Sequence, residues 1–226
     1  MIGLLRKTLF AGFMFAFTAG SALAEDILMP FVLAGTSSDS VDTVAADVKS
    51  KLSGGGFEIV GEYSPYDGTH IIVVTNDAMK ATAAKSEFGA YGAAARVSVT
   101  RNGDVTETVY TNPIYMAAAY RMASDMSDIR KQLEAALGAE KDFGSEKNLT
   151  AEDLRKYHYT VMMDYFDDPS ELAEYDSQAE ALKAVNDSLA AGLGATAKVY
   201  QIDIPGKDES VIGVALKGKD ADDCSG

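Results

Sequence analysis

The chain has 226 residues, of which 34 are Asp or Glu and 20 are Lys or Arg, so its formal net charge is −14. A surface this acidic repels the phosphates of nucleic acids and of anionic lipid headgroups, which excludes nucleic acid as a partner. Because 47% of the residues are hydrophobic, the chain can bury one large core or two small ones.

The start of the chain has the pattern of a secretory signal peptide. Arg6 and Lys7 are basic, residues 9–17 are mainly apolar, and the small residues 22–24 follow. We expect cleavage after Ala24 and export to the periplasm or the medium. The apolar run is shorter than the ~20 residues of a spanning helix, so an uncleaved membrane anchor is the weaker alternative.

The chain has one cysteine, Cys224, near its end. An intramolecular disulfide is therefore impossible, and the core must be stable without one. A lone thiol in an exported protein can bridge two chains or have no partner, and the sequence leaves both open.

The first half of the chain, residues 25–124, is predicted to form a complete domain. Its helices are expected to begin after the N-cap residues Ser40, Asn76 and Asn112. Asn102-Gly103 is a strong signal for a hairpin turn. Strands are expected at residues 27–34, 57–63, 70–75, 94–101 and 105–110. The predicted order is β-α-β-β-(α)-β-β-α, with the last helix running from Ile114 to about Met122.

The second half, residues 157–226, is predicted to form a partial β-α-β-β unit. Its helix begins at a capping box made by Ser177 and Glu180. Its strands are expected at residues 157–166, 197–204 and 211–214. Between the halves, residues 125–156 are expected to be a helical linker whose stretch 139–148 is polar.

The two halves share a spacing pattern that favours an internal duplication. Apolar residues of the second helix lie 141 positions after those of the first, as Val41 and Leu182 do. Coincidence between two ordinary α+β stretches is the alternative. The second half lacks the last hairpin and helix of the first, either because the repeat is naturally short or because the chain is truncated at Gly226.

Several motifs of the first half are similar to those of a bacterial family. They are residues 56–60, 96–99 and 102–105, and the segment Tyr110-Thr111-Asn112-Pro113. In this order, over about residues 40–122, they resemble the domain-of-unknown-function 302 family. The resemblance implies a β-α-β4-α domain related to the saddle-like fold of TATA-binding proteins. It also implies a homodimer and no established catalytic residues.

Candidate ligand-binding residues lie mainly at the corner between the last strand and the last helix of the first half. A helix N-terminus offers free N–H groups to an anion, and tyrosines offer flat faces with polar tips. Ordinary packing tyrosines around a well-capped helix are the alternative. The candidates are Tyr110, Asn112, Tyr115, Tyr120 and Arg121, together with His158 on the predicted strand 157–166.

The other chemistry-bearing residues do not form a catalytic or metal-binding motif. The acidic run 164–176 lacks the spacing of a calcium loop, and the methionines are typical of core residues. We therefore predict an α+β, exported, soluble and non-enzymatic binding or accessory module, without cofactor or metal, for an unknown small molecule or protein. A small-molecule hydrolase, or a soft-metal (copper) handling protein using His70 or His158, is the alternative.

Overall fold

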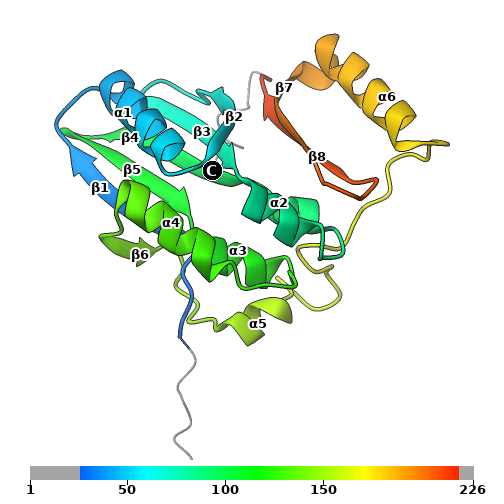
Figure 1. Cartoon of the computed structure of the whole chain (residues 1–226), viewed down its shortest axis with the longest axis horizontal. Coiled ribbons are helices and arrows are strands. Elements are labelled where there is room, and N and C mark those ends of the chain that lie inside the picture. Colours follow the sequence, from blue (N-terminus) through cyan, green and yellow to red (C-terminus); the bar gives the residue numbers. More distant parts are fainter. Residues whose placement is uncertain (1–25, 219–226) are drawn as a thin grey trace, which may run out of the picture.

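The computed structural model describes residues 26–218, so the predicted signal peptide and Cys224 lie outside the described residues. This part of the chain forms two antiparallel sheets and six α-helices, which confirms the predicted α+β class (Figure 1). No helix of residues 26–218 combines the length and apolarity that a membrane span requires.

The first half has the predicted order of elements. Its strands are β1 (Phe31–Ser37), β2 (Glu58–Tyr63), β3 (Thr69–Thr75), β4 (Ala95–Asn102) and β5 (Val105–Thr111). Its helices are α1 (Val41–Gly54), α2 (Asp77–Ala83), the 3₁₀ helix η1 (Gly89–Gly92) and α3 (Pro113–Ala119). The side chains of Ser40, Asn76 and Asn112 each accept a hydrogen bond from the first turn of their helix, as predicted.

Two boundaries differ from the prediction. The first strand begins at Phe31 rather than at residue 27, directly after Pro30, which has no N–H to donate to a neighbouring strand. The last helix ends at Ala119 rather than near Met122. Arg121 has a φ of 48°, and this left-handed conformation cannot continue a right-handed helix.

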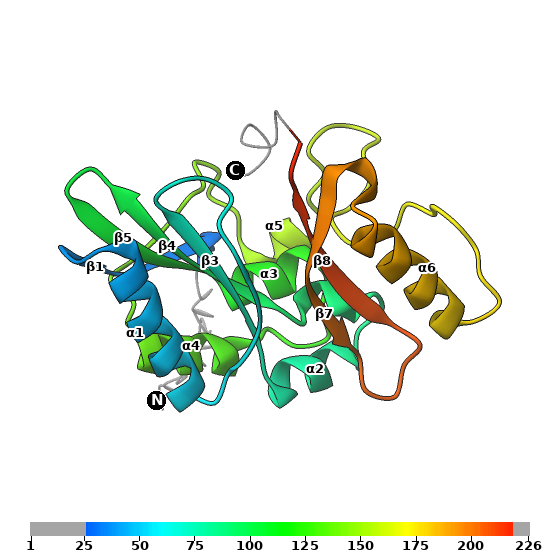
Figure 2. The same ribbon diagram turned by 90° about the horizontal axis from the view of Figure 1, so that it is seen from above.

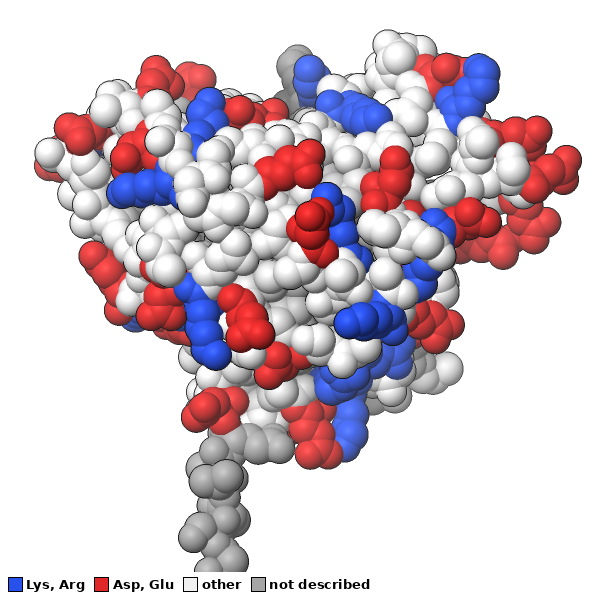
Figure 3. Space-filling model, viewed as in Figure 1, with Lys and Arg blue, Asp and Glu red and all other residues white. Residues whose placement is uncertain are grey.

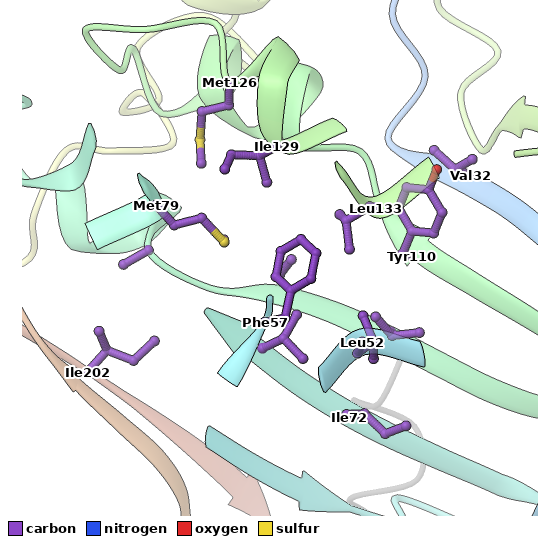
Figure 4. Close-up of a cluster of buried hydrophobic side chains, with 14 of the residues drawn as sticks. Val32, Leu52, Phe57, Ile72, Met79, Tyr110, Met126, Ile129, Leu133 and Ile202 are labelled. Carbon is purple, nitrogen blue, oxygen red and sulfur yellow. The ribbon is translucent and has the colours of Figure 1, made fainter. Parts of the chain in front are cut away.

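The main sheet has six strands in the order β2-β3-β4-β5-β1-β6, and all its pairs are antiparallel. One face is apolar, with Val32, Tyr110, Val97 and Ile72 in register across four strands. Helices α1 and α4 (Ser127–Leu137) cover this face (Figure 2). The side chains between them form the hydrophobic core (Figure 4).

The middle segment is helical as predicted but also contains a strand. Helix α5 (Ala151–Arg155) begins at a capping box of Thr150 and Asp153. Strand β6 (Lys141–Phe143) pairs with β1 inside the stretch predicted to be a polar linker. The strand is held by tertiary contacts, since Arg130 makes a two-pronged ion pair with Asp142 and Phe143 packs on a ring of β1.

The strand predicted at residues 157–166 does not form. The segment instead folds back on itself, so that the rings of Tyr157 and Phe166 stack with centroids 5.7 Å apart. Met162 has a φ of 70°, which breaks an extended backbone. A strand needs a neighbour for its N–H and C=O groups, and no described strand pairs with this segment. The second unit is therefore α-β-β rather than β-α-β-β.

The second unit consists of α6 (Gln178–Ala190), the 3₁₀ helix η2 (Leu193–Ala195), β7 (Thr196–Asp203) and β8 (Ser210–Leu216). Its hairpin has the same pairing as β2–β3, including the position of a β-bulge. The unpaired bulge residues are Val60 and Val199. The partners of the residues just before them, Val74 and Val214, lie 140 positions apart. This shared register supports the predicted duplication for the α-β-β part.

The two units pack closely and share one core. At the contact between β2 and β7, a Cβ on Gly61 would lie 2.4 Å from the carbonyl oxygen of Val199, so only glycine fits there. Ile202 and Ile204 of the second unit are almost fully buried in the core of the first. Figure 4 shows Ile202 pointing toward the same cluster as Met79 and Ile72.

Candidate functional site

The face of the main sheet opposite α1 and α4 carries in-register rows of side chains. Because successive side chains of a strand point to opposite faces of the sheet, the side chains on this face point away from the buried Val97 and the core. One row consists of Leu33, Val109, Ser98, Ile71 and Tyr63. The next row contains Phe31, Thr111 and Arg96.

A groove of about 240 Å³ lies on this face of the sheet. Its apolar and aromatic lining residues are Phe31, Tyr63, Pro65, Tyr66, Ile71, Val109 and Tyr110, of which Tyr110 is buried. Its hydroxyl-bearing lining residues are Thr69, Ser98, Thr100 and Thr111. Among the described lining residues, Arg96 alone carries a charge. A mostly apolar hollow with a few hydroxyls and one charge is typical of small-molecule sites.

Arg96 differs from the other arginines that the structure describes. Arg121 and Arg130 pair with carboxylates, and Arg101 and Arg155 donate to backbone carbonyl oxygens. Within residues 26–218, the guanidinium of Arg96 makes no hydrogen bond and no ion pair with the protein, and its side chain is exposed. Arg96 is therefore the one arginine of the described residues whose guanidinium has neither an acidic nor a carbonyl partner.

Tyrosines from several elements gather near Arg96. Burial raises the pKa of the Tyr120 and Tyr200 hydroxyls, and the nearby Arg96 charge opposes this rise. The ring of Tyr120 also stacks on Tyr91 of η1, with centroids 5.4 Å apart. The second unit thus contributes Tyr200 to the surroundings of a cation on the first unit's sheet. A guanidinium beside phenolic hydroxyls is a donor-rich environment for an anion.

The structure separates the predicted site residues, and two of them are structural. Tyr110 is fully buried in the core, where its hydroxyl donates to the carbonyl of Gly138 at 3.2 Å. Burial raises the pKa of Tyr110 to about 12. The buried side chain of Asn112 caps α3 and donates to the carbonyl of Met29 at 2.8 Å. Neither side chain is available to a ligand.

Arg121 and His158 are brought together through Tyr165. The guanidinium carbon of Arg121 lies 4.0 Å from the centre of the Tyr165 ring, and the His158 ring centre lies 4.0 Å from it. Arg121 is held by the buried Asp167 at 2.8 Å and by Asp168 at 2.9 Å. The hydrogen bond to Asp167 raises the pKa of Arg121. This cluster fastens the segment after α5 to the end of α3, and its charge is already neutralised.

Tyr120 is the predicted residue that lies beside Arg96, whereas Tyr115 lies near Tyr157 and Lys147. The groove itself was not predicted. A usable signal was present on β4, where Arg96 and Ser98 alternate with apolar Val97 and its neighbour Val99. Alternation places the polar pair on one face, but only the sheet register shows which aromatic residues share it.

The two histidines have different partners and do not meet. His70 contacts Ser64 through Nδ1 at 3.2 Å and Glu62 through Nε2 at 2.7 Å. Burial alone would raise the pKa of Glu62, but hydrogen bonds from His70 and Lys49 and their charges lower it below its ordinary value. This chain of serine, histidine and carboxylate is the one arrangement around a histidine that resembles a hydrolase triad.

The acidic run before α6 is exposed except for the buried Asp167, and Figure 3 shows acidic side chains over this end of the helix. Within residues 26–218, no group of three or more His, Cys, Asp or Glu side chains is arranged to hold a metal ion. Met122 and Met126 are buried in the core, as expected for methionines that fill space.

The chain matched no protein-family model, no curated protein and no solved structure. The resemblance to the domain-of-unknown-function 302 family therefore stays a prediction.

Proposed function

We propose that this protein is an exported, non-enzymatic binding module that takes a small organic anion into the groove beside Arg96. The observation that carries the proposal is the exposed guanidinium of Arg96, which has no partner within residues 26–218 and borders an aromatic groove. Export is inferred from the signal-peptide pattern of the first 24 residues.

The chemistry of the groove favours a carboxylate with a flat apolar body. A guanidinium can donate two parallel hydrogen bonds to a carboxylate. The rings of Phe31, Tyr63 and Tyr66 offer apolar surface to the rest of the ligand. The hydroxyls of Ser98 and Thr100 add polar contacts that select among ligands of similar size.

Calorimetric titration with benzoate, acetate and uncharged benzamide tests the proposal. We expect benzoate to bind more tightly than either analogue, because only benzoate has both the carboxylate and the ring. Arg96→Ala should weaken benzoate binding about 10- to 100-fold, the loss expected for a charge-assisted hydrogen-bond pair. Arg96→Lys should recover part of it, because the charge stays but the forked geometry is lost.

Lys131→Ala is the matched control, since it removes an exposed cation from α4 on the other face of the sheet. Its affinity for benzoate should equal that of the unchanged protein. Equal binding by the Arg96→Ala variant, or a preference for benzamide over benzoate, would show that Arg96 does not define the site.

A second candidate function is ester hydrolysis by Ser64, favoured by the hydrogen-bonded chain Ser64–His70–Glu62. The geometry is less suitable, since Ser64 lines none of the described cavities and Nδ1 rather than Nε2 faces it. Turnover of p-nitrophenyl acetate that disappears in Ser64→Ala, but persists in Ser98→Ala, would establish this activity. Turnover that is unchanged in Ser64→Ala would eliminate it.

A further inference from the structure

Strand β8 has an exposed edge of unusual composition. Within the described residues it pairs only with β7, and none of its seven residues carries a charge. Val214 and Leu216 are 42% and 57% exposed. Natural sheet edges are usually protected by charged residues, proline or a covering segment, because an open apolar edge pairs with other strands. An uncharged edge on a chain of net charge −14 therefore points to a pairing partner.

The first unit shows which kind of partner fits. Strand β3 has the same position as β8 in the shared hairpin register, and its second edge is paired with β4. The second unit has no described counterpart of β4. Helix α6 also has no buried residue, whereas the equivalent helix α1 buries Val44, Ala45, Val48 and Leu52. A strand added to β8 would take the place that β4 has in the first unit, and it would extend the sheet surface beneath α6.

A hollow beside β8 marks the surface that such a strand would cover. It has a volume of about 560 Å³ and lies between α6 and β8. Its apolar lining includes Leu182, Val185 and Ile212. Ile212 alternates with the residues that face the first unit, so Val214 and Leu216 lie on the same side of β8 as Ile212.

The hydrogen bonds of β8 restrict how a second strand can pair. The carbonyl of Glu209 accepts a hydrogen bond from the N–H of Ile204, and the N–H of Lys217 donates to the carbonyl of Ala195. Both groups therefore point toward β7, within the second unit. The N–H and C=O groups of successive residues in a strand point to opposite edges. Those of residues 210, 212, 214 and 216 therefore point away from β7, toward the open edge. An antiparallel second copy of β8 can form hydrogen bonds with all four of these residues in only one register. In that register the two-fold axis passes through Gly213, so that residue 210 pairs with residue 216 and residue 212 with residue 214.

In that register, Glu209 of one copy lies opposite Lys217 of the other at both ends of the strand, although the Glu209 carboxylate also accepts from the N–H of Ala90 at 2.7 Å and pairs with Lys207 at 3.1 Å within its own chain. The uncharged residues between them include Ile212, which pairs with Val214 of the second copy. The edge is thus complementary to itself in its backbone hydrogen bonds and its apolar side chains. A strand from an unrelated protein would have no reason to match this pattern.

We propose that two copies of this chain associate through β8 to form a continuous four-stranded antiparallel sheet, β7-β8-β8-β7, with both α6 helices on the same face. The proposal does not depend on the groove at Arg96, which belongs to the other sheet. It concerns the whole protein and makes the dimer interface a two-fold strand pairing.

Native mass spectrometry and light scattering of the purified protein, over the micromolar range, test the proposal. We expect a dimer, and we expect Val214→Lys to make it monomeric, because a lysine at this edge blocks strand addition. Val105→Lys is the matched control, since Val105 is similarly exposed at 38% but lies on β5, and it should stay dimeric.

Charge reversal provides a second variant with little effect on folding, because Lys217 is exposed and follows the last residue of β8. Lys217→Glu places like charges opposite each other at both ends, which should weaken the dimer about tenfold. Lys131→Glu makes the same charge change on α4 and should leave the dimer unchanged. A monomeric wild-type protein, or a dimer that withstands both Val214→Lys and Lys217→Glu, would overturn the proposal.

Discussion

Ile202 tests whether the two units fold as one. Its side chain is 4% exposed and belongs to the core cluster of the first unit, although β7 belongs to the second. Ile202→Ala removes three carbon atoms, which at about 0.8 kcal/mol per buried methylene is roughly 2.4 kcal/mol of lost transfer energy. The remaining cavity adds to this, so we expect the free energy of unfolding to fall by about 3 kcal/mol.

Urea denaturation followed by circular dichroism and by tyrosine fluorescence provides the assay, since the chain has no tryptophan. The midpoint should fall while the slope stays constant, because the surface exposed on unfolding is unchanged. Val105→Ala on β5 is the control. Val105 is 38% exposed, so its truncation should change the stability by less than about 0.5 kcal/mol.

One result would refute this reasoning. If the Ile202→Ala variant shows two transitions, of which only one is shifted, the second unit unfolds by itself. The shared core would then contribute little to cooperativity, and the close contact at Gly61 would be a docking surface only.

Two further predictions concern buried polar groups. The pKa of Tyr110 is raised by burial from 10.0 to about 12, so this hydroxyl stabilises the fold fully below pH 10 and loses that contribution as the pH rises through 12. In urea titrations the unchanged protein should therefore lose stability relative to Tyr110→Phe over that range, and parallel curves would contradict this. Asp167→Asn weakens the clamp on Arg121, which should cost about 1–2 kcal/mol locally and speed proteolysis within residues 157–176. An unchanged cleavage rate would show that the clamp does not hold the segment.

Local chemistry made most of the first unit predictable. The N-caps Ser40, Asn76 and Asn112 act within one helical turn, and the hairpin at Gly103 depends on a single positive φ of 59°. Such signals need no distant partner, so they can be identified in the chain directly. The spacing of the second helix and hairpin was readable for the same reason, and the α+β class followed from these elements.

Elements that depend on a distant partner were not predictable. The stretch 157–166 alternates like a strand, but no sheet edge accepts it, and it folds back on itself. Conversely, β6 has a polar sequence and becomes a strand because Arg130 and β1 hold it. Alternation of polar and apolar residues shows that a segment could form a strand with one buried face. Whether it does so depends on whether the edge of a sheet is free to pair with it.

The candidate site shows the same division. From the sequence alone, Tyr110 and Arg96 are both polar-tipped residues on strands. The register of the sheet sends Tyr110 into the core and Arg96 to the open face, among tyrosines from η1, the C-cap of α3 and β7. The sequence by itself determined the class of fold, the capped helices and the export signal pattern, because these depend on neighbouring residues. Tertiary structure alone decided which strands pair, which face is covered and which arginine of residues 26–218 lacks a partner, because each depends on residues far apart in the chain.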